Sequence, residues 1–209
     1  MGFAGLVAYL TQVLPQVAAA YRAAAANISV WTLGWRVFSG TGSTVIPSIT
    51  ASPLIKSALA ALVVSAVVPA LVLLIACLAV RKRRSLDASL GVMVCVSILV
   101  SPISWGHYLV LAAIPAAQVI RWLTCRQFPS RETNNALLVA GLLAIPDGAW
   151  AKLAFLLAGQ TPVAGTGSTL PFAPSLLTLG PALAVGALGW LVLTLRAAEM
   201  DEQAMPRAR

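Results

Sequence analysis

Residues 57–80 read SALAALVVSAVVPALVLLIACLAV and carry no charged side chain. At about 1.5 Å per helical residue, this run is long enough to cross the ~30 Å hydrocarbon core of a bilayer. It is followed at once by the basic cluster RKRR at residues 81–84, which is typical of the cytoplasmic end of a membrane helix. The sequence therefore predicts an all-α fold, a polytopic bundle of transmembrane helices.

The composition of the whole chain agrees with this interpretation. Hydrophobic residues make up 59% of the 209 residues and charged residues 10%, whereas about a quarter of a soluble domain is charged. The net charge is +8, but the basic residues lie in short clusters beside hydrophobic runs. This pattern favours the positive-inside rule over nucleic-acid binding. Cys77, Cys95 and Cys125 lack paired spacing, so we expect small buried hydrophobes rather than disulfides or metal ligands, and no metal or cofactor.

Four further crossings are expected, giving about five membrane helices within residues 54–196. Residues 88–120 are uncharged apart from His107, and at about 50 Å they are too long for one straight crossing. The bend is expected in the sequence SPISWG at residues 101–106, because proline removes a backbone donor and glycine relaxes the chain. Residues 86–100 then form a helix of only about 22 Å. His107 is therefore expected below the lipid surface, inside a protein cavity.

The remaining segments complete the predicted topology. Hydrophobic runs at residues 136–158 and 175–195 are the last two crossings, joined by a loop rich in Gly, Thr and Pro at residues 159–174. Residues 1–53 are expected to form an outward loop and an interfacial helix, or the end of another crossing. Residues 197–209 are expected to be a polar cytoplasmic tail without regular structure.

The distribution of Lys and Arg predicts the orientation. Basic residues concentrate in residues 81–87, residues 121–135 and the C-terminal segment, so these segments are predicted to be cytoplasmic. The chain is accordingly expected to be a multi-pass protein of a bacterial inner membrane with a cytoplasmic C-terminus. Residues 21–53, the elbow at residues 101–107 and the loop at residues 159–174 then face outward.

Two outward segments carry most of the unusual polar residues. Asn and Ser can hydrogen-bond sugar hydroxyls, Arg can bind phosphate bidentately, Trp can stack on a pyranose and His can exchange protons near neutral pH. Each also has a structural interpretation: the indoles as interfacial aromatics, and the guanidinium as a cation reaching toward headgroups. The candidate residues are Asn27, Ser29 and Arg36 in the first segment, and Ser101, Ser104, Trp105, His107 and Tyr108 in the second.

Asp147 and Lys152 interrupt the fourth hydrophobic segment. Five residues apart on a helix, they lie about 140° from each other and do not face one another directly. A structural charge pair or a kink near the outer boundary is the favoured interpretation. The alternative is that one of them lines the cavity for a lipid substrate.

The same two segments resemble motifs of bacterial glycosyltransferase family 87. The first motif matches at Asn27, Ser29 and Arg36, with Gly34 displaced from the usual spacing. The second, Ser-Pro-x-Ser-Trp-x-His-His, matches from Ser101 to His107, with Tyr108 in place of the second histidine. The resemblance covers approximately residues 10–125, and the remainder only through hydropathy.

The resemblance implies a membrane fold of the GT-C type. It further implies transfer of a mannosyl or other hexosyl group from a polyprenyl-phosphate donor to a glycan or glycolipid acceptor at the outer face. His107 would be catalytic, and the other residues of the two motifs would bind the donor. The family's acidic general base has no counterpart before Asp87, so the chain is interpreted as the C-terminal half of such an enzyme. The alternative is a non-catalytic polytopic membrane protein, either a remnant or a transporter component.

Overall fold

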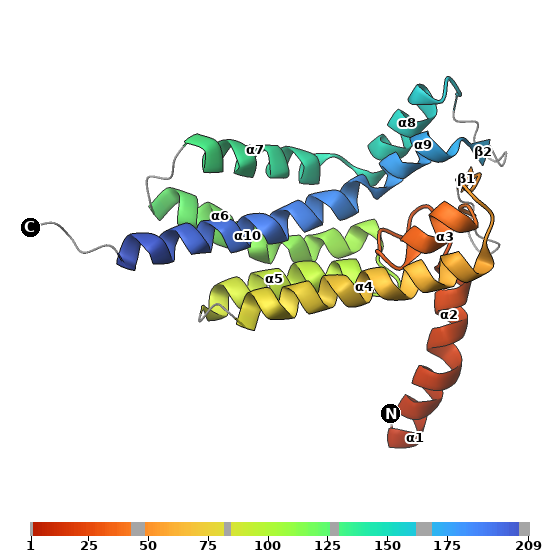
Figure 1. Ribbon diagram of the computed structural model, residues 1–209, viewed down its shortest axis with the longest axis horizontal. Coiled ribbons are helices and arrows are strands. Elements are labelled where there is room, and N and C mark those ends of the chain that lie inside the picture. Colours follow the sequence, from red (N-terminus) through yellow and green to blue (C-terminus); the bar gives the residue numbers. More distant parts are fainter. Residues whose placement is uncertain (1, 43–48, 82–84, 126–129, 162–168, 205–209) are drawn as a thin grey trace, which may run out of the picture.

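The structure, a computed structural model, describes residues 2–42, 49–81, 85–125, 130–161 and 169–204. It is 77% helical, which confirms the all-α prediction (Figure 1). The N-terminal helix is built from α1, a π-helical turn and α2, at Phe3–Ala8, Tyr9–Val13 and Leu14–Tyr21. The other elements are α3 Thr32–Phe38, β1 Thr50–Ala51, α4 Ala58–Arg81, α5 Leu86–Val100, the 3-10 helix η2 Gly106–Ala112, α6 Ala113–Cys125, α7 Ser130–Ala144, α8 Asp147–Leu157, β2 Thr169–Leu170, α9 Phe172–Ser175, the 3-10 helix η3 Leu176–Leu179 and α10 Gly180–Ala204.

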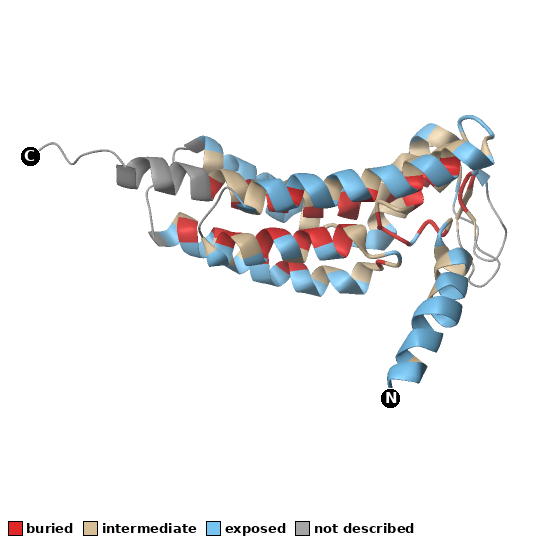
Figure 2. Ribbon diagram, turned by 60° about the horizontal axis from the view of Figure 1, so that its bottom comes forward, coloured by how far each residue is buried: buried red, intermediate tan, exposed pale blue. Residues whose placement is uncertain are grey.

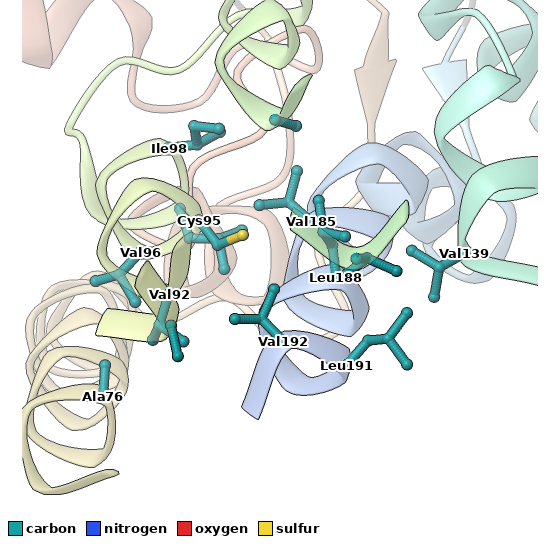
Figure 3. Close-up of a cluster of buried hydrophobic side chains, with 14 of the residues drawn as sticks. Ala76, Val92, Cys95, Val96, Ile98, Val139, Val185, Leu188, Leu191 and Val192 are labelled. Atoms are coloured by element: carbon teal, nitrogen blue, oxygen red, sulfur yellow. The ribbon is translucent and has the colours of Figure 1, made fainter. Parts of the chain in front are cut away.

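The hydrophobic core lies mainly between α5 and α10. Val92 and Cys95 of α5 face Val185, Leu188 and Val192 of α10, and all five side chains are buried (Figure 3). The small thiol of Cys95 lets the two helices approach closely. The expectation of a buried, unpaired cysteine is confirmed at Cys95 and was wrong at Cys77, which is free but exposed. The side chain of Cys125 lies outside the described part of the chain.

Within the described residues, three helices are long and apolar enough to cross a membrane. They cover Phe3–Tyr21, Ala58–Arg81 and Phe172–Leu195. A fourth candidate is the pair Arg131–Ala144 and Asp147–Leu157, which is bent by 87°. Two of the five predicted crossings are therefore full-length helices at the predicted places.

The remaining predicted crossings are shorter or broken. α5 covers the expected 15 residues, and α6 has only 13. Between them Ser101 caps α5, and the chain turns before η2 begins at Gly106, so the predicted elbow is confirmed. α10 continues to Ala204, and the prediction that regular structure ends near residue 196 was wrong.

The described helix ends that border the predicted basic segments lie at one end of the bundle. Figure 1 shows the C-terminal ends of α4, α6 and α10 together with the N-terminal ends of α5 and α7. The opposite end holds α3, α8 and α9 and the two short strands. β1 pairs in parallel with β2, with Thr50 opposite Thr169, which ties two segments that were expected to be loops. The grouping of the turns is as predicted from the positions of Lys and Arg.

The N-terminal helix projects away from the bundle as an exposed arm (Figures 1 and 2). The helix has 19 residues, its mean hydropathy reaches 1.4 over 18 of them, and none of its residues is buried. Large apolar side chains such as Phe3, Leu6 and Leu10 are exposed. The helix therefore has the length and composition of a crossing rather than those of the short interfacial helix that was one expectation.

Candidate functional site

Asn27 joins the two polar segments. Its amide oxygen accepts hydrogen bonds from the backbone N–H groups of Ser29 at 3.1 Å and Ser104 at 2.9 Å. Its amide nitrogen donates to the carbonyl of Pro102 at 3.1 Å and to that of Tyr21 at 3.4 Å. The side chain is 1% exposed. Because all its partners are backbone groups, Asn27 fixes the path of both segments at once.

Ser29 and the following residues extend this junction toward the end of α5. The Ser29 hydroxyl donates to the carbonyl of Leu99 at 3.1 Å, and the backbone N–H of Val30 donates to the same carbonyl. The indole of Trp31 donates to the carbonyl of Val100 at 2.6 Å. These bonds satisfy carbonyls that α5 leaves without partners where it ends. The first segment thus caps the helix that leads into the second.

Gly34 explains how α3 can lie directly on α4. A Cβ added at Gly34 would lie 2.7 Å from the backbone nitrogen of Ser65 and would overlap the carbonyl oxygen of Ala61. Only glycine permits this backbone approach. The spacing of Gly34 differs from that in the family motif, but the close packing of α3 on α4 explains why a glycine stands there.

Arg36 lies inside the protein, with 1% of its surface exposed. Its guanidinium donates to the carbonyls of Ala25 and Asn27 at 2.8 and 2.9 Å, and also to the hydroxyls of Thr32 and Thr178. Burial lowers the pKa of Arg36 to about 10, so the group stays protonated at neutral pH. The cation holds the chain before α3 against η3. A role for Arg36 in phosphate binding stays a prediction.

His107 lies on the surface beside two aromatic rings, so the expectation that a protein cavity encloses it was wrong. Its imidazole is exposed, 4.6 Å from the ring of Tyr108 and 6.3 Å from that of Trp105, measured between centroids. Trp105 in turn meets Tyr21 edge-on at 5.4 Å. The structure therefore groups His107, Trp105 and Tyr108, and it places Arg36 in the interior instead of among them.

The two serines of the second segment have different surroundings. The hydroxyl of Ser101 donates to the carbonyl of Ile103 at 2.8 Å, which closes the turn of the elbow. Ser104 is fully buried, and its backbone carbonyl accepts from Ile28 at 2.7 Å. Within the described residues its hydroxyl has no hydrogen-bond partner. Both serines serve the turn that sets the position of His107.

Asp147 lies against the elbow at Gly106, the residue that precedes His107 in the sequence. Its carboxylate occupies the space where a side chain at Gly106 would be, so that an added Cβ would overlap Oδ2. Asp147 begins α8 after Pro146, at the helix end where a negative charge is stabilised. Among the described residues the one ion pair is Arg121–Asp87, so the expected charge pair of Asp147 with Lys152 is not formed, while the expected kink is present.

Asp147 also lines a cavity of about 240 Å³. Ala25 and Ile28 of the first segment, Gly148 and Ala151 of α8, and Thr178 of η3 are among the other lining residues. Thr178 is the partner of Arg36, so the buried cation lies directly behind this wall. The cavity is mainly apolar, with one carboxylate and one hydroxyl as its polar groups.

No family model, curated protein or solved structure matches this chain. The chemistry of the site therefore rests on its own geometry. An imidazole and two aromatic rings are grouped on the elbow, and a carboxylate that lines a cavity lies against Gly106 of the same elbow. Within the described residues no group of three or more His, Cys, Asp or Glu side chains could hold a metal ion.

Sequence reasoning missed two features of this site. Thr178 lies in a stretch interpreted as a featureless span, and its bond to Arg36 joins residues 142 positions apart. The approach of Asp147 to Gly106 is also long-range. One signal for it was available in the sequence, since an acidic residue after proline inside an apolar segment is costly unless it lines a cavity.

Proposed function

We propose that this chain is a membrane glycosyltransferase of the GT-C class. In this proposal it transfers a hexosyl group, mannosyl in the first instance, from a polyprenyl phosphate to a hydroxyl of a glycan or glycolipid acceptor. The observation that carries the proposal is the placement of the Asp147 carboxylate against Gly106, adjacent to His107 and on the wall of a cavity. An acid and an imidazole on the same elbow, with the acid on the wall of an apolar cavity, suit transfer from a lipid-linked donor.

The membrane setting is supported by the helices themselves. Three of them have the length and hydropathy of a crossing, and apolar side chains of α4 such as Leu59 and Leu71 are exposed. The basic segments gather at the end opposite the site (Figure 1). By the positive-inside rule, the site then faces outward from a bacterial inner membrane and the C-terminus is cytoplasmic.

The proposed reaction is a displacement at the anomeric carbon. The Asp147 carboxylate takes the proton of the acceptor hydroxyl as that oxygen bonds to the anomeric carbon. The bond from this carbon to the phosphate oxygen breaks, and its electron pair leaves with the polyprenyl phosphate. His107, which can carry a proton near neutral pH, stabilises the charge that develops on the leaving phosphate. Trp105 and Tyr108 offer ring faces for the sugar.

The remaining residues of the two motifs position this pair. Asn27 and Ser29 hold the elbow through their bonds to Pro102, Ser104 and Leu99. Arg36 holds the wall of the cavity through Thr178. In this scheme none of the three needs to touch the donor, which accounts for their burial.

The test is sugar transfer by membranes that contain the full chain. Membranes are supplied with radiolabelled polyprenyl-phosphate mannose and a lipid extract as acceptor. Asp147→Asn is expected to lower the initial rate on the order of 100-fold, the loss typical of a missing general base. The matched control Asp87→Asn removes a carboxylate at the other end of the bundle, where it pairs with Arg121, and should leave the rate unchanged. Equal rates for Asp147→Asn and wild type would refute the assignment.

One observation favours a second candidate, a non-catalytic polytopic membrane protein. The side chains of Asn27 and Arg36 make their hydrogen bonds to groups of the protein itself, as expected where polar residues only hold loops together. This candidate predicts no labelled product from wild-type membranes. It also predicts that His107→Ala and Asp147→Asn leave any background transfer rate unchanged.

A further inference from the structure

A second cavity, also of about 240 Å³, lies where the N-terminal helix meets α3 and α4. The lining includes an arginine, two indoles, a serine hydroxyl and two prolines: Arg22, Trp31, Trp35, Ser65, Pro15 and Pro102. Pro102 belongs to the elbow, so this cavity is close to the candidate site but shares none of its lining residues with the cavity of Asp147.

Arg22 is the cation of this second cavity. Its guanidinium carbon lies 3.9 Å from the centre of the Trp35 ring, a cation–π contact that fixes one face of the guanidinium. The N–H groups in the plane of the guanidinium remain available, in a fork that matches the oxygens of a phosphate. Arg22 is exposed, and within the described part of the chain no carboxylate pairs with it. It thus presents an oriented positive charge without an anion.

Ser65 adds an observation that is independent of Arg22. It lines the cavity from α4 and is only 4% exposed. Its hydroxyl finds no hydrogen-bond partner among the described residues. Leaving a buried hydroxyl unpaired costs about 1–3 kcal/mol, so a polar ligand atom in this cavity would stabilise the arrangement.

The walls around these polar groups are apolar. Ala18 and Ala19 of α2 and Leu62 and Ala66 of α4 line the cavity, and Leu62 is 59% exposed at its edge. Both helices have the properties of membrane crossings. A ligand in this position would have its charged group near Arg22 and its apolar part between two lipid-facing helices.

We propose that this cavity binds the phosphate group of an anionic lipid, with Arg22 and Ser65 on the phosphate and the lipid chain between α2 and α4. The source of that phosphate is either a polyprenyl phosphate or a phospholipid of the surrounding bilayer. The proposal shares the membrane setting with the proposed function but does not need sugar transfer. Lipid binding to this cavity is tested by a binding assay, whereas the proposed sugar transfer is tested by the transfer rates of Asp147 variants. A failure of the lipid-binding proposal can therefore be told apart from a failure of the proposed function.

The experiment measures the tryptophan fluorescence of the purified full chain in neutral detergent, since Trp31 and Trp35 line the cavity. The chain is titrated separately with polyprenyl phosphate, the corresponding polyprenol, phosphatidylglycerol and inorganic phosphate. We expect saturable binding of one or both anionic lipids and none of the polyprenol. Arg22→Gln should weaken binding on the order of tenfold, and Ser65→Ala about threefold. The matched control Lys56→Gln removes an exposed cation at the same end of α4 and should bind like wild type.

The titrations distinguish polyprenyl phosphate from a phospholipid of the bilayer, and they can also refute the proposal. Binding of polyprenyl phosphate alone assigns the site to that lipid, and binding of phosphatidylglycerol alone assigns it to the bilayer. Binding of both assigns it to the shared phosphate. Equal affinity of wild type and Arg22→Gln, an equal loss in Lys56→Gln, or binding of polyprenol or inorganic phosphate as tight as that of the lipids would overturn the proposal.

Discussion

Replacing Asn27 with alanine tests the junction between the two polar segments. The substitution removes the acceptor for two buried N–H groups, those of Ser29 and Ser104, and the donor to the Pro102 carbonyl. Each buried polar group that loses its partner costs about 1–3 kcal/mol. The two N–H groups alone therefore predict a loss of roughly 2–6 kcal/mol in the free energy of unfolding.

This loss is measured as a shift in the thermal midpoint of the purified protein in detergent, followed by circular dichroism. At about 2–4 °C per kcal/mol for a chain of this size, the midpoint of Asn27→Ala should fall by at least ~4 °C. Asn135→Ala is the matched control, because Asn135 is exposed on α7. Asn27→Asp should also destabilise, since a carboxylate cannot donate to the Pro102 carbonyl. A midpoint for Asn27→Ala within 1 °C of the control, on the order of the measurement error, would refute the junction.

Three further predictions use the same thermal assay. Gly34→Leu should lower the midpoint by several degrees, because the new side chain would overlap α4 at Ala61; a midpoint like wild type would show that α3 does not lie on α4. Arg36→Met should cost roughly 2–4 kcal/mol, since two carbonyls and the hydroxyl of Thr178 lose a donor; no change would mean that water already serves these groups. Arg121→Gln should cost less than about 1 kcal/mol, because this ion pair is exposed, and a large loss would contradict its surface position.

The sequence predicted those parts of the fold that depend on local properties. The helix at residues 58–81 follows from length and apolar composition alone, and the elbow after Ser101 follows from proline and glycine in one short stretch. The grouping of the basic turns at one end follows from alternation of direction along a bundle. None of these predictions required knowledge of which helices touch.

The site was predicted only in part, because its contacts join distant residues. The sequence identified Asn27 and Arg36 as unusual, but residue type does not tell whether a polar side chain points toward a ligand or toward the carbonyls of its own loop. The approach of Asp147 to Gly106 depends on an 87° bend whose direction has no local signal. The β1–β2 pair was missed because strands of two residues are too short to show alternation.

The bond between Arg36 and Thr178 also bears on the order in which the chain is assembled during translation. Arg36 leaves the ribosome 142 residues before its hydroxyl partner, and β1 likewise precedes β2. Until η3 is delivered, the guanidinium has water where Thr178 will be, and α3 cannot be fully enclosed. The end of the bundle that carries the site is thus completed only when η3 has been synthesised. A nascent chain arrested before residue 172 would expose Arg36 to solvent, where an arginine-directed reagent would modify it, while the finished protein would protect it.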